Sequence, residues 1–296
     1  MALDRKRRRG LRDNRRTPID CTHMTDRYAV LGNPIGHSKS PLIHSLFAQS
    51  TGQDIAYTAI ETPLDGFNET VLAFSAGGGR GLNVTLPFKL QAFEIATDPS
   101  ERARLAGAAN CLKFDGDRIV ADNFDGVGLV NDLQRNLGCP LAGKRVLLLG
   151  AGGATRGALL PIAAQHPALI TVANRTADKA HALQRDFAAH ARLQSGGYGD
   201  LQGHSFDVVI NATSAGLTQE TLPLEAGVFA PGAVAYDMVY GKGLTPFLQQ
   251  ARAAGVSTVA DGVGMLVEQA AEAFAWWRGV RPATQPVIQR LTVPLV

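Results

Sequence analysis

A run of apolar residues that ends in a glycine-rich turn constrains the fold of this chain more than any other feature. The run is Val146-Leu-Leu-Leu149 and the turn is Gly150-Ala-Gly-Gly-Ala154, with a helix-compatible segment at 156–165. This order predicts a buried parallel strand, a tight loop and the N-terminus of a helix. The glycines let the backbone approach a pyrophosphate, and the free N–H groups of the helix start favour its negative charge. The sequence therefore predicts a dinucleotide site.

The residues after the next predicted strand indicate which dinucleotide binds. The strand is Leu169-Ile-Thr-Val-Ala173, and it is followed by Asn174-Arg-Thr176 and then Lys179. An NAD site usually has an acidic residue here for the ribose 2′-hydroxyl, whereas an Arg suits the 2′-phosphate of NADP. Arg forms charge-assisted hydrogen bonds to phosphate, and a Thr suits a helix N-cap. NADP(H) is the expected cofactor, and the alternative is that these cations are solvated charges at a helix start.

Composition is that of a globular protein with room for two domains. The chain has 296 residues, 45 % hydrophobic and 19 % charged, and no apolar run approaches the ~20 residues that span a bilayer. Cys21, Cys111 and Cys139 are far apart, which fits a reducing cytosol and argues against disulfides or a thiolate metal site. The histidines have no metal-ligand spacing, so no metal is expected. We expect a cytoplasmic monomer or homodimer without a membrane partner.

The excess positive charge lies at the N-terminus. Residues 1–23 hold eight Lys or Arg and three Asp, whereas the remaining residues hold 21 basic and 23 acidic side chains. A run such as Arg5-Lys-Arg-Arg-Arg9 also occurs in nucleic-acid or targeting segments. It has no apolar region of the kind a secretory signal needs. We favour a disordered leader before a second candidate start, Met24, and do not expect nucleic acid as a partner.

Strand and helix signals alternate from Tyr28 onward, and the dinucleotide unit lies in the middle of the chain. The segments expected before it are a helix capped by Ser40, a strand at 81–86, a hairpin at 110–123 and a helix at 125–136. An apolar helix at 263–277 comes too late to join the dinucleotide sheet, so we expect it to return to the N-terminal domain.

The predicted fold is therefore α/β, with a split N-terminal α/β substrate domain, a Rossmann-type dinucleotide-binding domain and the active site in the cleft between them. The expected boundaries are 1–23 for the leader, 24–124 and 262–296 for the substrate-binding domain, and 125–261 for the NADP-binding domain.

Two polar clusters are candidates for acid–base chemistry. A nicotinamide enzyme that oxidises an alcohol needs a group that takes the hydroxyl proton as hydride leaves. In Asn83-Val-Thr-Leu-Pro-Phe-Lys89, Asn83 and Thr85 share a strand face and Lys89 lies at the strand's exit. Asp122-Asn-Phe-Asp-Gly126 lies where the chain enters the cofactor domain. A Lys and an Asp brought together would form a coupled pair, although each alone is typical of a structural role.

Nine motifs in the same order resemble the shikimate dehydrogenase family, from Arg27 to the C-terminus. They are Gly32-Asn-Pro-Ile-Gly-His-Ser-Lys-Ser-Pro41, Asn83-Val-Thr-Leu-Pro-Phe-Lys89, Ala108-Ala-Asn110, Asp122-Asn-Phe-Asp-Gly126, Gly150-Ala-Gly-Gly-Ala154, Asn174-Arg-Thr176, Asn211-Ala-Thr-Ser214, Tyr236-Asp-Met-Val-Tyr240 and Asp261-Gly-Val-Gly-Met-Leu-Val-Glu-Gln269. The family reduces 3-dehydroshikimate to shikimate with NADPH, a step toward chorismate and the aromatic amino acids. The resemblance implies an NADP-dependent oxidoreductase acting on a small cyclitol carboxylate.

The resemblance also implies a role for each polar side chain in these motifs. Lys89 and Asp125 are implied as the catalytic acid–base pair. The implied substrate-binding residues are Ser38, Ser40, Asn83, Thr85, Lys89, Asn110, Asp125, Tyr240 and Gln269. Among them, the serines and the tyrosine would donate to the substrate carboxylate, and the amides and the threonine would read the ring hydroxyls. Such groups suit a polyol, because each unpaired buried partner costs about 1–3 kcal/mol.

The implied cofactor-binding residues surround the glycine-rich turn and the ends of the neighbouring strands. They are Gly150, Ala151, Gly152, Gly153, Ala154, Asn174, Arg175, Thr176, Lys179, Thr213, Met238 and Gly262. By the same resemblance, Met238 and Gly262 should line the nicotinamide pocket.

One residue departs from the family pattern, which usually has Thr directly before the catalytic aspartate. This chain has Phe124 there. We hypothesise that a ring facing the cleft narrows or alters substrate specificity, whereas a ring turned into the core changes nothing.

Two alternatives remain open on the sequence alone. A relative that acts on quinate, with or without a preference for NAD, is the nearest one. Because quinate has an extra hydroxyl at the carbon bearing the carboxylate, Ser at both 38 and 40 favours shikimate. The second alternative is a non-catalytic NADP-binding protein, against which the presence of both Lys89 and Asp125 argues.

Overall fold

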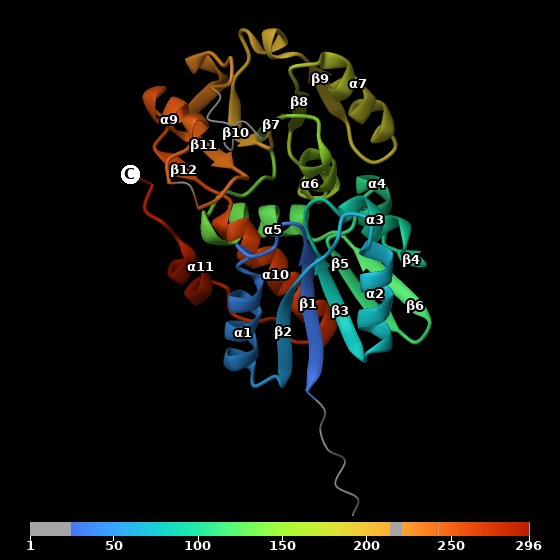
Figure 1. The fold of residues 1–296 in the computed structure, drawn as a ribbon. Helices are drawn as coiled ribbons and strands as arrows, with labels where there is room; N and C mark the ends of the chain where they lie inside the picture. The colour runs from blue at the N-terminus through green and yellow to red at the C-terminus, as the bar shows by residue number, and fades with distance from the viewer. Residues whose placement is uncertain (1–24, 214–220, 242, 296) are drawn as a thin grey trace, which may run out of the picture.

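Strands and helices alternate along the chain and form two lobes, each built on a six-stranded sheet (Figure 1). The computed structural model describes residues 25–213, 221–241 and 243–295. The leader expected at 1–23 and the candidate start Met24 lie outside these residues. The predicted α/β fold class is confirmed, because parallel strands alternate with helices in both lobes.

The first sheet belongs to the N-terminal part of the chain. Its strands are β1 (Asp26–Gly32), β2 (Ile55–Glu61), β3 (Gly79–Val84), β4 (Asp98–Pro99), β5 (Cys111–Asp115) and β6 (Arg118–Asp122), in the order β2-β1-β3-β5-β6-β4. Strands β1 to β3 are parallel, whereas β5 and β6 form the antiparallel hairpin expected at 110–123. The helices of this lobe are α1 (Ser40–Thr51), α2 (Phe67–Ala76), α3 (Lys89–Glu94) and α4 (Glu101–Ala106).

The second sheet is entirely parallel. Its strands are β7 (Arg145–Leu149), β8 (Leu169–Ala173), β9 (Leu193–Gly196), β10 (Phe206–Asn211), β11 (Phe229–Asp237) and β12 (Thr258–Ala260), in the order β12-β11-β10-β7-β8-β9. Its helices are α6 (Gly153–Ala163), α7 (Ala177–Asp186), α9 (Pro246–Ala253) and the short 3₁₀ turns η2 (Tyr198–Leu201) and η3 (Ala226–Val228). The strand order reverses between β7 and β10, and ligands bind at the carboxyl ends of strands at such a point.

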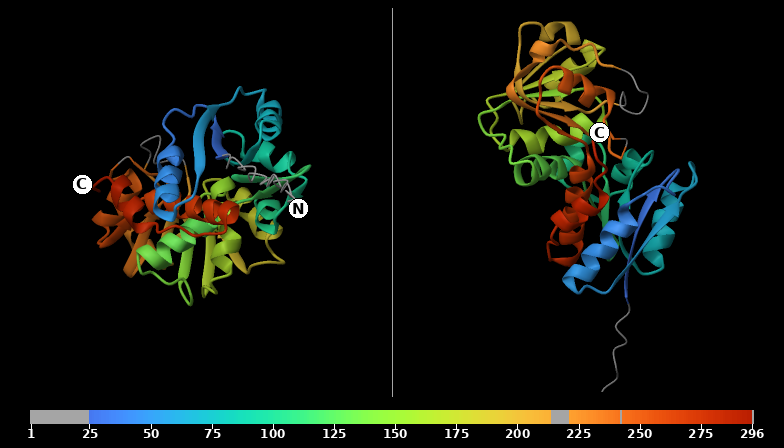
Figure 2. Two further views of the ribbon diagram at one scale, coloured as in Figure 1. Left: turned by 90° about the horizontal axis from the view of Figure 1, so that it is seen from below. Right: turned by 90° about the vertical axis from the view of Figure 1, so that its left-hand side faces the viewer.

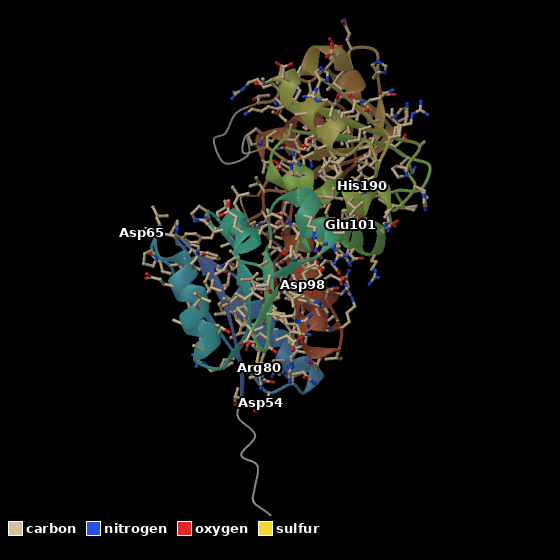
Figure 3. All side chains as sticks on the ribbon, turned by 90° about the vertical axis from the view of Figure 1, so that its right-hand side faces the viewer. Asp54, Asp65, Arg80, Asp98, Glu101 and His190 are labelled. Atoms are coloured by element: carbon tan, nitrogen blue, oxygen red, sulfur yellow. The ribbon has the colours of Figure 1, made fainter. Side chains whose placement is uncertain are left out.

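Helix α5 (Asp125–Asn131) lies where the two lobes meet, and its glycines allow close packing. A Cβ on Gly126 would lie 2.3 Å from a carbonyl oxygen of α6, and one on Gly128 would lie 2.7 Å from a carbonyl oxygen of α10 (Val263–Arg278). At the rim of this junction, His190 Nδ1 of the second lobe lies 3.8 Å from Glu101 Oε1 of α4, and Figure 3 shows the two labelled residues close together.

The C-terminal helices α10 and α11 (Gln285–Leu291) pack on the first lobe. Phe274 of α10 is fully buried in one cluster with Ile43 and Phe47 of α1. Trp277 donates its indole N–H to the Leu112 carbonyl at 3.0 Å, which ties α10 to β5. Figure 2 shows α10 running alongside the first sheet, so residues more than 150 positions apart in the chain share one core.

Three expected boundaries differ from the structure. Ser40 is the first residue of α1 rather than its cap, because the Ser38 hydroxyl accepts the Ser40 N–H at 3.3 Å. Strand β3 ends at Val84, because the Phe88 N–H bonds to the Thr85 carbonyl and turns the chain out of the sheet. Helix α6 begins at Gly153, inside the glycine-rich turn, rather than at 156.

The helix expected at 125–136 changes type within its length. After α5, residues Asp132–Asn136 form the π-helical turn η1. The buried Asp132 carboxylate accepts hydrogen bonds from the Tyr236 hydroxyl at 2.7 Å and from the Asn136 side-chain amide at 2.8 Å. A regular amphipathic helix would expose the Asp132 carboxylate, but these two hydrogen bonds hold it in the interior. Because one partner lies on β11, the local sequence does not indicate the change of helix type.

Candidate active site

A lysine and an aspartate from different elements meet at the end of the first sheet that faces the second lobe. Lys89 is the first residue of α3 and Asp125 is the first residue of α5. Lys89 Nζ donates to Asp125 Oδ2 at 2.6 Å, with side chains 29 % and 19 % exposed. An ammonium has three N–H groups, so Lys89 retains donors for another oxygen. The pair is therefore both fixed and accessible.

The Asp125 carboxylate is held on its other side by an amide. Asn110 Nδ2 donates to Asp125 Oδ1 at 2.8 Å and to Gln269 Oε1 of α10 at 3.3 Å, while Asn110 Oδ1 accepts the Phe124 N–H at 2.9 Å. Asn110 is 3 % exposed. Both carboxylate oxygens thus have one fixed donor each, which sets the orientation of the Lys89 ammonium.

Asn83 lies behind this pair and is also held by two partners. Its Oδ1 accepts from the Tyr57 hydroxyl at 2.7 Å, and its Nδ2 donates to the Asn110 carbonyl at 3.3 Å. Hydrogen bonds therefore bring together five of the residues that the sequence predicted for the substrate site. They are Asn83, Lys89, Asn110, Asp125 and Gln269.

The remaining predicted substrate residues lie in loops, except Ser40, which is the first residue of α1. Tyr240 follows β11 in the second lobe, and its side chain is 40 % exposed. Ser38 is half-buried and accepts the N–H of the buried Ser40. The Thr85 methyl group packs against the backbone at the end of β1, so no described contact joins this side chain to the pair.

The loop between β7 and α6 has the backbone geometry that the glycines predicted. Gly150 has φ +101°, and a Cβ there would lie 2.9 Å from the Thr213 methyl carbon. The Ala151 N–H donates to Asn174 Oδ1 at 3.2 Å, which ties the loop to the end of β8. Around Gly152 and Gly153, a Cβ would meet no described atom within 4 Å. The loop therefore leaves open space next to the helix start, beside Ala154, as a pyrophosphate requires.

The residues after β8 present cations at the surface. Asn174 Nδ2 donates to the Thr176 carbonyl at 2.8 Å, which fixes this turn. Arg175 and Lys179 are exposed, and neither forms an ion pair with any residue that the structure describes. Thr176 is the N-cap residue of α7 but makes no capping hydrogen bond with its side chain. These donors remain available to a phosphate.

The other predicted cofactor residues, Thr213, Met238 and Gly262, follow the carboxyl ends of β10, β11 and β12. Thr213 donates its N–H and hydroxyl to Asn211 Oδ1, at 3.1 and 2.7 Å. A Cβ on Gly262 would lie 2.3 Å from the Met238 carbonyl oxygen, so the start of α10 contacts this strand end directly. Ser214, the last residue of the motif that contains Thr213, lies outside the described residues.

Phe124 does not take the orientation that would affect a substrate. The side chain is 4 % exposed, and its ring packs edge-on against Trp276 with centroids 5.7 Å apart. The Arg102 guanidinium lies over the Phe124 ring, 5.4 Å from its centroid. The ring is turned into the core, so the hypothesis that its bulk narrows substrate choice has no structural basis.

Sequence reasoning missed two residues next to this site. Tyr57 and His44 stack with ring centroids 4.1 Å apart, and Tyr57 is bonded to Asn83. Tyr57 on β2 and His44 on α1 occupy positions that the sequence pattern assigns to the core. Only the contact between their rings in the folded structure indicates a further role.

No helix within residues 25–213, 221–241 and 243–295 is long and apolar enough to cross a membrane. In the same ranges, no three His, Cys, Asp or Glu side chains are grouped so that they could hold a metal ion.

Comparison with family models gives three matches along the chain. The shikimate dehydrogenase substrate binding domain matches residues 30–112, the shikimate/quinate 5-dehydrogenase model matches 132–220, and the shikimate 5′-dehydrogenase C-terminal domain matches 262–292.

Individual proteins are similar over almost their whole length. The NADP(+) shikimate dehydrogenase of Dechloromonas aromatica is 56 % identical over 273 residues, which cover 92 % of this chain and all of the relative. That of Chromobacterium violaceum is 55 % identical over 268 residues, with 90 % and 98 % covered.

Solved structures agree with this similarity. The Ael1 enzyme from Pseudomonas putida has a TM-score of 0.89 and 59 % identity, covering 92 % of this chain and 100 % of the other. Shikimate 5-dehydrogenase from Thermus thermophilus, in complex with NADP(H) and shikimate, has a TM-score of 0.79 and 32 % identity, covering 90 % and 100 %.

Proposed function

The chain belongs to the shikimate dehydrogenase family, and on that premise we propose that it catalyses the reversible NADPH-dependent reduction of 3-dehydroshikimate to shikimate. The observation that carries the proposal is the 2.6 Å contact between Lys89 Nζ and Asp125 Oδ2. A hydride transfer at a hydroxyl-bearing carbon needs a positioned group that moves the hydroxyl proton. Relatives named NADP(+) shikimate dehydrogenase at 54–56 % identity support the same reaction.

The Lys89–Asp125 pair holds the proton in both directions of the reaction. When bound, NADP(H) supplies the hydride or takes it up. In the oxidation, the pair accepts the proton of the substrate hydroxyl, and in the reduction it returns a proton to the carbonyl oxygen. Because the two groups are coupled, the proton belongs to the pair rather than to one residue. Asn110 keeps the carboxylate in place while the charge changes.

The side chains around the pair would bind the substrate ring. Ser38, Ser40 and Tyr240 would donate to the carboxylate of the substrate, and the amides and Thr85 would bind the ring hydroxyls. This arrangement favours a cyclitol carboxylate because a deoxygenated analogue would leave buried amides unpaired.

The residues after β8 would select NADP over NAD. Arg175, with Asn174, Thr176 and Lys179, would bind the 2′-phosphate, since exposed donors without acidic partners suit a dianion. The open space at Gly152 and Gly153 would take the pyrophosphate, next to the N–H groups of α6. The ends of β10 and β11 would surround the nicotinamide through Thr213, Met238 and Gly262.

We further propose the organisation and setting of the enzyme. The substrate-binding domain would comprise 24–124 and 262–296, supported by the packing of α10 on α1, and the NADP-binding domain would comprise 125–261. The protein would act in the cytoplasm as a monomer or homodimer, which suits the free thiols of Cys111 and Cys139.

Replacing the lysine of the pair tests the proposed chemistry. We expect Lys89→Ala to lower kcat with shikimate and NADP⁺ by roughly 10²-fold or more, as loss of a positioned acid–base group does. Lys113→Ala is the matched control, because Lys113 lies on β5 of the same lobe and its ammonium donates to the Trp276 carbonyl. Unchanged turnover in Lys89→Ala, with both variants folded, would contradict the proposed role.

A further inference from the structure

We propose that Tyr57 is a positioning residue that fixes the Asn83 side chain as a hydrogen-bond donor toward the substrate. The assignment rests on the proposed function, because it concerns the same site. Tyr57 lies on β2, outside the motifs that identify the family, and its hydroxyl contacts Asn83 rather than the Lys89–Asp125 pair.

The hydrogen bonds of Asn83 determine which way its amide faces. The Asn110 carbonyl oxygen can only accept, so the group 3.3 Å from it must be Nδ2. Asn83 Oδ1 then faces the Tyr57 hydroxyl at 2.7 Å, and because Oδ1 can only accept, Tyr57 must donate. A flipped amide would place two acceptors against each other at Asn110. One N–H of Nδ2 remains for a further acceptor.

The Tyr57 hydroxyl stays protonated and therefore keeps donating. Burial is the largest cause that raises its pKa well above the ordinary value, and the Cys111 thiol adds to the rise. The Ser40 hydroxyl of α1 acts in the opposite direction, but the pKa of Tyr57 stays raised on balance.

The ring of Tyr57 has little freedom to move. His44, one helical turn after Ser40, stacks on it with centroids 4.1 Å apart and planes 5° from parallel. Trp277 of α10 contacts the same group, with centroids 5.5 Å from His44 and 6.5 Å from Tyr57. The hydroxyl position is consequently set by rings from α1 and α10 rather than by the strand alone.

The expected consequence is a loss of substrate affinity rather than of chemistry. Without the hydroxyl, Asn83 keeps its hydrogen bond to the Asn110 carbonyl and loses the one that holds Oδ1, so its side chain is less tightly fixed. The Lys89–Asp125 pair is held by the side chain of Asn110 and keeps its geometry. Loss of one neutral hydrogen bond of this kind weakens substrate binding by roughly three- to tenfold.

Steady-state kinetics of Tyr57→Phe test this directly. We expect the KM for shikimate to rise about three- to tenfold, with kcat and the KM for NADP⁺ changed less than about twofold. Tyr28→Phe is the matched control, since Tyr28 lies opposite Tyr57 on β1 and its hydroxyl accepts from Arg278 at 3.4 Å. An unchanged shikimate KM in Tyr57→Phe, or an equal change in Tyr28→Phe, overturns the proposal.

A double-mutant cycle shows whether Tyr57 acts through Asn83. In an Asn83→Ala background, Tyr57→Phe should raise the shikimate KM no further, because the group it positions is gone. Additive effects of the two substitutions would overturn the proposal.

An NMR measurement separates this inference from the proposed function. The Asn83 side-chain amide signals, assigned by their loss in Asn83→Ala, should shift or broaden in Tyr57→Phe and not in Tyr28→Phe. Unchanged signals would overturn the positioning role even in an active enzyme. If the unmodified protein does not oxidise shikimate, the proposed function fails, and the amide signals still decide whether Tyr57 fixes Asn83.

Discussion

At the scale of single residues, the candidate site depends on how each polar atom is satisfied. Asp125 receives one hydrogen bond from Lys89 and one from Asn110, and Asn110 also holds Gln269 from the C-terminal helix. The motifs predicted these residue types and their neighbourhood. They did not predict which atom bonds to which, because the partners come from α3, α5, α10 and the residue before β5, and they meet only after folding.

The buried ring of Phe124 leads to a prediction about stability rather than specificity. We expect Phe124→Thr to lower the free energy of unfolding by about 2–4 kcal/mol, because it removes the ring contacts with Trp276 and Arg102. The shikimate KM and kcat should change less than about twofold. Urea unfolding and initial rates on the same preparations measure both. A shift in substrate preference without loss of stability would restore the specificity hypothesis.

His44 predicts a pH dependence of stability. Its ring is fully buried, and burial lowers its pKa from 6.5 to about 3, while the neighbouring Asn83 side chain acts in the opposite direction. Above pH 6.5 the imidazole is neutral in both the folded and unfolded chain and contributes nothing. Below pH 6.5 only the unfolded chain takes up the proton, so stability falls by about 1.4 kcal/mol per pH unit until about pH 3.

His44→Phe isolates this contribution. A phenyl ring keeps the stacking on Tyr57 and does not titrate, and neither ring nitrogen of His44 has a hydrogen-bond partner among the described residues. Denaturant unfolding at pH 7.5, 6 and 5 should show the variant gaining stability relative to the unmodified protein as pH falls. Parallel pH profiles of the two proteins would contradict the assignment.

At the scale of elements, the sequence best predicted those features that are determined by the local residue types. The β7–α6 turn was predictable because Gly150 needs φ +101° and adjoins an apolar strand. The π-helical turn η1 was not, because it depends on a distant partner. The Asp132 carboxylate accepts a hydrogen bond from the Tyr236 hydroxyl of β11.

The open space at Gly152 predicts a defect that affects the cofactor alone. We expect Gly152→Ala to leave the melting temperature unchanged, because a Cβ there meets no described atom within 4 Å and φ is −91°. The KM for NADP⁺ should rise about tenfold or more, since the methyl group would occupy room proposed for the pyrophosphate. Gly227→Ala, also open but on η3, is the control and should change neither quantity. A stable variant with an unaltered NADP⁺ KM would refute the proposed phosphate position.

At the scale of the whole molecule, the order of motifs was the strongest predictor. The family inferred from nine motifs in register is confirmed, and so are the α/β fold class and the NADP-dependent oxidoreductase class. A chain whose dinucleotide unit lies between two parts of another lobe must bring its C-terminus back, and α10 does so through Phe274 and Trp277. The sequence did not reveal that Tyr57 would join this core to the site, because its strand has an ordinary alternating pattern.

The most direct test of the proposed function is the reduction of NADP⁺ and NAD⁺ by the purified protein, each with shikimate and with quinate. We predict rapid turnover with shikimate and NADP⁺ and at least about tenfold lower kcat/KM for the other three combinations, since Arg175 and the serines at 38 and 40 favour that pair. Preference for quinate or for NAD⁺, or no turnover of shikimate, would contradict it.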